Sequence, residues 1–249
     1  ISALDNGVGV IGVAPDAQVL PVKVLSEHLG GGFSSWIMQG ILYAVSQGAD
    51  VINMSLSGTV DFSTVPPGER DDVMRSMIVA YRRVINYASQ QGTLVVVSAG
   101  NGGMNLDGTG QLWIRPAEFE TAVTVSATAP YGLGVDPNAD LDRPASYTNT
   151  GRSLVDFAAP GGDWVFPSSL YFHDMILSTG SNDSYYFSAG TSMAVPHVAG
   201  VAALIIGENG GSMKPAQLLR ELRRRAEDLG QRGRDPIYGQ GRISTGYWD

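Results

Sequence analysis

The sequence predicts an α/β fold, a three-layer sandwich in which helices cover both faces of a mainly parallel central sheet. Short runs of β-branched residues alternate along the chain with segments of helical periodicity, as they do where crossover helices join parallel strands. Several of these runs are predominantly apolar, without the regular apolar–polar alternation of a half-exposed strand, which is typical of strands buried on both faces. With 249 residues and 43% hydrophobic content the chain can bury one large core. We therefore expect a single domain over residues 1–249.

Apolar, β-branched runs locate the expected strands. They cover residues 19–25, 51–56, 93–98, 122–127 and 154–158. Between them, residues 102–114 and 161–184 are rich in Gly, Ser, Asn and Asp, and we expect these stretches to form surface loops.

Apolar residues at helical spacing locate the expected helices. The first covers residues 34–46, with Ser34 or Ser35 as its cap. The second covers residues 71–90 and begins with acidic residues, which the positive end of the helix dipole favours. Its apolar positions, beginning with Val73, are expected to face the core.

Charge and composition exclude several classes of function. The formal net charge of −8 leaves no surplus of Lys and Arg to neutralise phosphates, so nucleic acid is not an expected partner, whereas a basic or neutral peptide is easier to accommodate. The absence of cysteine excludes disulfides, thiolate metal sites and a cysteine nucleophile. No uninterrupted apolar run approaches the ~20 residues of a membrane span, so none is expected.

A serine candidate nucleophile lies in residues 190–200, which read Gly-Thr-Ser-Met-Ala-Val-Pro-His-Val-Ala-Gly. Gly190 permits a sharp turn, and Ser192 is then expected in the first turn of a third helix. Unpaired backbone N–H groups at that position favour developing negative charge. The alternative from the residues alone is that Thr191 or Ser192 merely caps the helix.

A polar amide follows the expected strand at residues 93–98. Residues 95–102 read Val-Val-Val-Ser-Ala-Gly-Asn-Gly, so Asn101 comes directly after the strand's carboxyl end. In an open parallel sheet, ligands bind at that end of the strands. An Asn-Gly pair is also common in simple turns, and the residues alone leave both interpretations open.

These two segments resemble those of the subtilisin family of serine peptidases. The first resembles Gly-Thr-Ser-Met-Ala-x-Pro-His, whose Ser is acylated by the substrate, and the second resembles Ala-Gly-Asn, whose Asn donates to the oxyanion together with the N–H of that Ser. The resemblance implies a subtilisin-like fold, catalytic roles for Ser192 and Asn101, a peptide or protein substrate and a secreted enzyme. It extends from Ile1 to about Leu229.

Two further segments resemble the family's substrate-binding edges. Residues 50–58 are similar to the strand that pairs with the substrate main chain, and residues 30–36 are similar to the segment on its opposite side. The resemblance implies that substrate is bound by Gly31, Gly32, Phe33, Ser55, Leu56, Ser57, Ala99 and Gly100. The chain departs from the family at the rear of the S1 pocket, where it offers Trp113 or Ile114 in place of the usual glycine.

The opening residues contain a Gly-x-Gly-x-x-Gly pattern from Gly7 to Gly12. A dinucleotide site is not expected there, because no strand precedes Gly7 and Pro15 follows where the helix should continue. The string instead resembles the family's calcium loop, in which carbonyls and an Asn side chain bind the ion. That resemblance implies calcium as a cofactor, with ligands from Leu4, Asn6, Val8 and Val10. A second, weaker cation loop is implied at Ala117, Phe119 and Ala122.

The family's catalytic Asp and His motifs are not found in this sequence. Its three histidines are His28, His173 and His197. His197 comes five residues after Ser192 on one helix, about 140° round and about 7.5 Å along, so it should point elsewhere. The other two are expected on the surface.

We therefore expect the chain to be the C-terminal portion of such a peptidase, processed or truncated inside a helix of the family and inactive alone. Its expected partner is the missing N-terminal segment or propeptide. The alternative is a non-catalytic subtilisin-like module that binds peptides or a partner protein. The presence of both Ser192 and Asn101 favours the enzyme.

Overall fold

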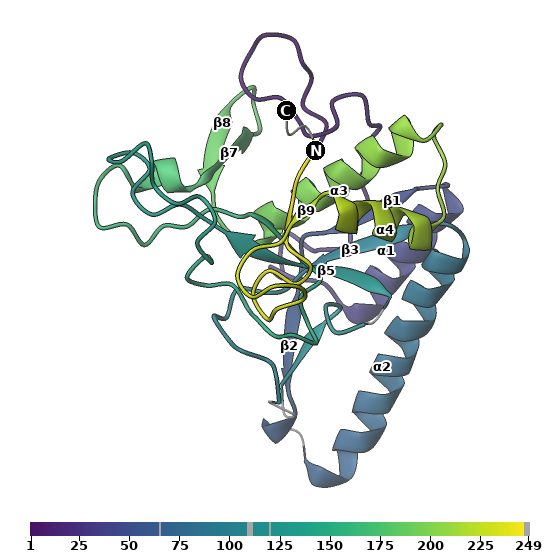
Figure 1. Ribbon diagram of the computed structural model, residues 1–249. Helices are drawn as coiled ribbons and strands as arrows, with labels where there is room; N and C mark the ends of the chain where they lie inside the picture. The colour runs from purple at the N-terminus through teal and green to yellow at the C-terminus, as the bar shows by residue number, and fades with distance from the viewer. Residues whose placement is uncertain (65, 109–111, 120, 247–249) are drawn as a thin grey trace.

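A mainly parallel sheet forms the centre of the computed structural model, which describes residues 1–64, 66–108, 112–119 and 121–246 (Figure 1). Within these residues the sheet has six strands in the order β1-β3-β5-β6-β10-β9. Every neighbouring pair is parallel except β10 with β9. The strands are β1 (Val51–Met54), β3 (Leu94–Ser98), β5 (Ala122–Thr128), β6 (Phe157–Pro160), β9 (Ala226–Glu227) and β10 (Arg242–Ile243).

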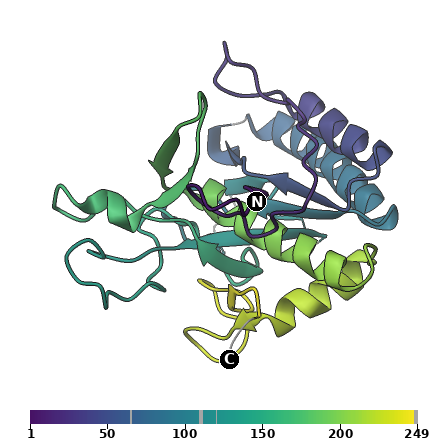
Figure 2. The ribbon, with the colours of Figure 1, turned by 90° about the horizontal axis from the view of Figure 1, so that it is seen from above.

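Helices cover the sheet on both faces, which confirms the predicted three-layer architecture. Side chains alternate between the two faces of a strand, and β3 divides accordingly. Leu94 and Val96 pack in one core cluster with α3 (Thr191–Glu208) and α4 (Pro215–Arg224). Val95 and Val97 pack in the other with α1 (Ser34–Ser46) and α2 (Pro67–Gln90). Figure 2 shows the two helix pairs on opposite sides of the sheet.

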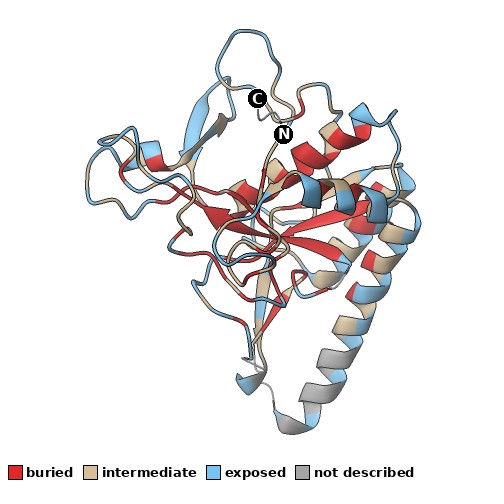
Figure 3. Cartoon of the chain, viewed as in Figure 1, coloured by how far each residue is buried: buried red, intermediate tan, exposed pale blue. Residues whose placement is uncertain are grey.

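The central strands are buried along their whole length, as their unalternating apolar sequences predict. All residues of β3 and β5 are buried, and Figure 3 shows the buried residues concentrated in these strands and on the side of α3 that faces them. α3 is the one helix of the described residues that is long and apolar enough to span a membrane. Because 56% of it is buried inside this core, its apolarity is explained by its contacts with the sheet.

The predicted helices form, α1 over the predicted residues and α2 with an earlier start than expected. α1 begins at Ser34 with Phe33 as its N-cap and no side-chain cap. The expectation that Ser34 caps the helix is wrong, since its Oγ instead accepts a hydrogen bond from Arg115 at 2.7 Å. α2 begins at Pro67, where the fixed φ of proline suits the first helical position. The predicted core position Val73 lies outside the side chains that the structure describes.

Two strand predictions are wrong in whole or in part. Residues 19–25 form no strand: Val19 is 62% exposed, and within the described residues β1 pairs only with β3. A run with the right composition stays unpaired when no neighbouring strand lies beside it. The strand predicted at 154–158 begins only at Phe157, because the N–H groups of Leu154 and Val155 donate to Gly151 in a turn.

The stretches expected to be loops contain short antiparallel pairs. β4 (Leu112–Arg115) pairs with β2 (Gly58–Asp61), which precedes the short helix η1 (Phe62–Thr64). β7 (Ile176–Thr179) pairs with β8 (Tyr185–Ser188), and η2 (Tyr171–Asp174) precedes it. Pairing with partners elsewhere in the chain overrides the polar composition of these segments.

Candidate active site

The start of α3 meets the chain segments that follow β1 and β3. Ser192 lies in the first turn of α3 and is half-buried. Its Oγ donates to the Ser55 carbonyl at 3.3 Å, and the Ser55 Oγ donates to the Ser192 carbonyl at 2.8 Å. This reciprocal pair joins the helix start to the segment after β1.

The N-cap of α3 is Gly190, at φ 153°, and no side chain caps the helix. The alternative that Thr191 or Ser192 is an N-cap is therefore wrong. The N–H of Gly190 donates to the Gly161 carbonyl at 2.9 Å, which fixes the turn that presents Ser192.

Asn101 is held against the residue that precedes Ser192. Its Oδ1 accepts hydrogen bonds from the Thr191 N–H at 2.9 Å and from the Thr191 Oγ1 at 2.7 Å. Because a backbone N–H can only donate, the oxygen of the carboxamide must face Thr191. The amide Nδ2 then lies beside Gly190, 3.5 Å from the position that a Cβ on Gly190 would take. Asn101 itself is exposed, so this N–H₂ group is accessible to a ligand.

The two predicted walls of the S1 pocket face each other. The Ser57 Oγ lies 3.5 Å from the position of a Cβ on Gly100, whose φ of 96° suits glycine. Trp113 and Ile114, the predicted rear of the pocket, are buried in the core cluster that also contains Ala99. Leu56 packs at the edge of the same cluster.

The segment predicted to hold the other side of a substrate is a separate, exposed turn. Phe33 is 59% exposed and packs edge-on against Trp36, with ring centroids 4.7 Å apart. The Gly31 carbonyl accepts from the Ser26 N–H at 2.9 Å, and a Cβ on Gly32 would lie 2.2 Å from the Val24 carbonyl. Among the described residues, no hydrogen bond joins this turn to Ser192 or Asn101.

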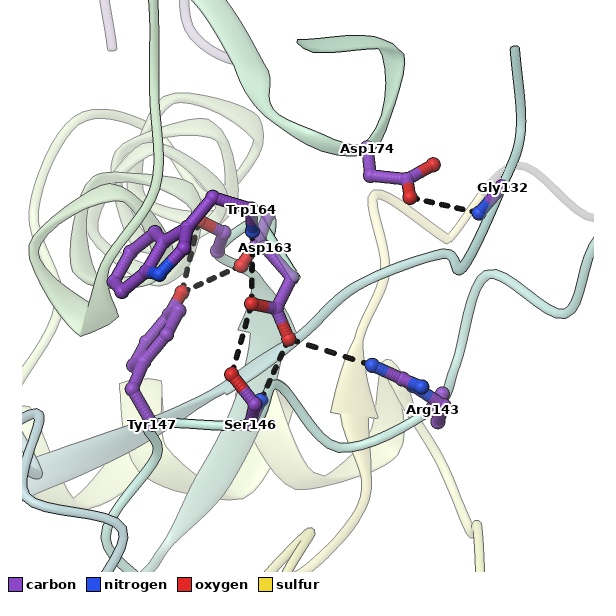
Figure 4. A network of polar contacts seen from close by, with 9 residues as sticks. Gly132, Arg143, Ser146, Tyr147, Asp163, Trp164 and Asp174 are labelled. Carbon is purple, nitrogen blue, oxygen red and sulfur yellow. Dashed lines mark hydrogen bonds and ion pairs between the residues drawn. The ribbon is translucent and has the colours of Figure 1, made fainter. Parts of the chain in front are cut away.

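A polar network centred on the buried residues Tyr147 and Asp163 (Figure 4) supports Gly161, on which Gly190 rests. The Tyr147 hydroxyl donates to the Gly162 carbonyl at 2.7 Å and lies 3.1 Å from that of Gly161, and its ring stacks on Trp164. Burial, and next the charge of Asp163, raise the pKa of Tyr147, so the phenol stays protonated as a donor. Asp163 accepts from the neighbouring Ser146, Trp164 and Arg143.

Within the described residues, no hydrogen bond joins a histidine to Ser192. The Nδ1 of His197 lies 2.8 Å from the Met193 carbonyl of its own helix, and burial lowers its pKa, which keeps the imidazole neutral. His28 is exposed beside Glu27, and His173 packs against Phe172 in η2. The described residues thus contain a candidate nucleophile and an amide donor without a general base.

The predicted calcium loop has the right kind of ligand atoms in too small a number. Leu4 and Val8 are mostly exposed, and the Asn6 Oδ1 already accepts from the Val8 N–H at 3.1 Å. With the carbonyls of Leu4, Val8 and Val10, the loop offers four oxygen donors, whereas Ca²⁺ takes about 6–8. Within the described part of the chain, no group of three or more His, Cys, Asp or Glu side chains is placed to bind a metal.

The weaker cation loop is closed by its own hydrogen bonds. The Ala117 carbonyl accepts from the Thr124 Oγ1 at 2.6 Å, and the Phe119 carbonyl accepts from the Ala122 N–H at 2.9 Å. All three predicted ligand residues are buried. These contacts explain the loop without an ion.

Comparison with known proteins identifies the class to which this site and fold belong. The subtilase family (Peptidase_S8) matches residues 1–241, and the chain therefore belongs to that family. It is 32% identical over 243 residues to the minor extracellular protease Epr of Bacillus subtilis (strain 168), covering 98% of this chain and 30% of that protein.

Two further similarities agree with this assignment. The intracellular serine protease of Paenibacillus polymyxa is 38% identical over 205 residues, covering 82% of this chain and 50% of that protein. The crystal structure of a lanthipeptide protease matches with a TM-score of 0.77 and 32% identity, covering 93% of this chain and 69% of the other. The chain thus spans half or less of the two curated relatives, and agrees with the solved protease in its fold.

Sequence reasoning missed the role of Thr191 in orienting Asn101. The sequence suggests only a helix-capping role for Thr191, whereas in the structure its N–H and hydroxyl both donate to the Asn101 Oδ1. The 90 positions that separate the two residues leave no local signal for this contact.

Proposed function

We propose that this chain is the part of a serine endopeptidase that carries the nucleophile Ser192 and the oxyanion donor Asn101. The observation that supports it most is the double hydrogen bond from Thr191 to the Asn101 Oδ1. It sets the amide Nδ2 beside the turn from which Ser192 projects. A module that only binds peptides has no use for a donor at that point.

In this mechanism the Ser192 Oγ attacks the scissile carbonyl carbon while a base takes its proton. The carbonyl π electrons move to the oxygen, and the Asn101 Nδ2 and the Ser192 N–H donate to the resulting oxyanion. Collapse of the tetrahedral intermediate breaks the C–N bond, and the proton passes from the base to the leaving amine. Water then attacks the acyl-enzyme, which releases the carboxylic acid and restores Ser192.

The base is a His oriented by an Asp, and we infer that both come from an N-terminal segment or an associated fragment. The observations behind this inference are the contacts of His28, His173 and His197, none of which reaches Ser192. Unassisted, the Ser192 hydroxyl is a weak nucleophile, and we expect the chain alone to be nearly inactive.

The substrate is a peptide or protein bound in extended form. Ser55, Leu56 and Ser57 form one wall of the S1 pocket and Ala99 with Gly100 the other, while Gly31, Gly32 and Phe33 bind from the opposite side. Ser57 and Gly100 face each other, which supports this arrangement. The solved structure to which the chain is similar is that of a lanthipeptide protease, which agrees with a peptide substrate.

Calcium and secretion complete the proposal. Leu4, Asn6, Val8 and Val10 would supply four of the oxygen ligands of a calcium ion, and further oxygen ligands would have to complete the site. The charge of the ion would then stabilise the loop. Secretion agrees with the extracellular relative Epr, although the relative from Paenibacillus polymyxa is named as intracellular. Assaying the protein in the culture medium and in the cells would test whether it is secreted.

A fluorophosphonate probe tests the proposed nucleophile. In the protein that includes the segment supplying the base, the probe should label Ser192, and peptide mapping by mass spectrometry should locate the adduct there. Ser192→Ala should remove the label, and Ser181→Ala, an exposed serine at the tip of the β7–β8 hairpin, should keep it. Labelling of another residue would identify a different nucleophile, and no labelling at all would favour the non-catalytic binding module.

A further inference from the structure

Asn149 makes four hydrogen bonds to the loop that carries Asn101. Its N–H donates to the Gly100 carbonyl at 3.0 Å, and its Nδ2 donates to the Ala99 carbonyl at 2.9 Å. Its Oδ1 accepts from the N–H groups of Gly102 at 3.0 Å and Met104 at 3.1 Å. The bonds reach both sides of the oxyanion donor, so a single side chain fixes the backbone before and after Asn101.

The loop is shaped to receive this carboxamide. Asn149 is 1% exposed, and a Cβ on Gly100 would lie only 2.6 Å from the Asn149 Nδ2, so the loop backbone packs directly on the amide. Gly102 is also close, with the position of its Cβ 3.1 Å from the Asn149 Oδ1. Any longer side chain at Gly100 would displace the contact.

Backbone hydrogen bonds near Asn149 hold this residue in place. The Gly103 N–H donates to the Tyr147 carbonyl at 2.7 Å, and the Thr150 N–H donates to the Met104 carbonyl at 2.8 Å. Tyr147 belongs to the polar network that supports Gly161 and therefore the turn at Gly190. Residues 147–150 thus contact the loop that carries Asn101 and also Gly161, on which the turn before Ser192 rests.

We propose that Asn149 is a positioning residue that keeps the Asn101 amide aligned with Ser192, an inference that rests on the function proposed above. Because the carboxamide is buried, its loss removes the present hydrogen-bond partner of the Ala99 carbonyl and of the Gly102 and Met104 N–H groups, and we expect the loop to shift in response. A shift of the donor affects the bond to the oxyanion, which exists only in the transition state. The Asn149 N–H still donates to the Gly100 carbonyl after this loss and holds that part of the S1 wall in place, so we expect a larger effect on kcat than on KM.

A double-mutant cycle tests this proposal in the protein that includes the base-supplying segment. Asn149→Ala should lower kcat about 10- to 100-fold and leave KM within about twofold, as expected for a misplaced catalytic group. In the Asn101→Ala background, Asn149→Ala should lower kcat by less than about threefold, because the group it positions is already absent. Thr150→Ser, which keeps the same backbone contacts, serves as the matched control.

Each outcome of the cycle decides the question. An equal loss in both backgrounds would show that Asn149 only supports the fold, and a change confined to KM would contradict its action through Asn101. If Asn149→Ala fails to fold, Asn149→Ser is measured in the same cycle, since its hydroxyl retains a polar group at the site. Labelling of Ser192 by the fluorophosphonate tests the peptidase function separately, because it depends on the nucleophile. If Ser192 is labelled and the cycle contradicts the role of Asn149, this inference fails and the peptidase function stands.

Discussion

Replacing Ser192 by alanine should lower kcat for peptide hydrolysis by about 10⁶-fold, as loss of the nucleophile does in a serine peptidase. The substitution removes one oxygen from the start of α3. Among the described residues, the hydrogen bond that the Ser192 Oγ loses is the 3.3 Å bond to the Ser55 carbonyl. Hydrolysis of a fluorogenic peptide by the protein with its base-supplying segment measures the effect.

The loss should occur without a loss of fold. Ser192 is only half-buried, and the Ser55 Oγ keeps its bond to the Ser192 carbonyl, which the substitution does not touch. The thermal midpoint should therefore stay close to that of the unsubstituted protein. A Ser192→Ala protein that retains a tenth or more of the activity would contradict the assignment of the nucleophile.

Replacing Asn101 by alanine should lower kcat by about 10²- to 10³-fold, the usual effect of removing one oxyanion donor. KM should change by less than about threefold, because the lost bond forms only in the transition state. Asn101 is exposed, and within the part of the chain that the structure describes its Oδ1 accepts hydrogen bonds from Thr191 alone, so the fold should tolerate the change. Steady-state kinetics with one peptide series gives both constants.

Asn138→Ala is the matched control for this substitution. Asn138 is exposed on a distant loop, where its N–H binds Asp136 and its side chain has no part in the site. Its kinetic constants should equal those of the unsubstituted protein. A rise in KM at constant kcat for Asn101→Ala would mean that this residue binds the ground state rather than the oxyanion.

The central layer of the fold was predictable because its cause is local. β3 and β5 are buried on both faces, and that environment favours mostly apolar residues without regular alternation. The helices at 34–46 and 71–90 carry equally clear periodic patterns. The strand predicted at 19–25 fails because composition identifies a segment that can pair, whereas pairing depends on a neighbour elsewhere in the chain.

The sequence allows candidate site residues to be named, whereas it does not reveal their contacts. Ser192 and Asn101 stand in distinctive strings, while the bonds that orient them come from Thr191, Ser55 and Asn149. Asn149 lies in the string Tyr-Thr-Asn-Thr-Gly, which reads as a turn, and its partners are 45 to 50 positions away. Long-range hydrogen bonds of this kind leave no periodic signal in a sequence.

A crystal structure of the protein bound to a peptide boronic acid tests the central claim most directly, namely that Ser192 and Asn101 act on one carbonyl group. We predict a bond between boron and the Ser192 Oγ, with one boronate oxygen about 2.7–3.1 Å from the Asn101 Nδ2. A boronate bound to another residue, or one whose oxygens all point away from Asn101, would contradict the claim.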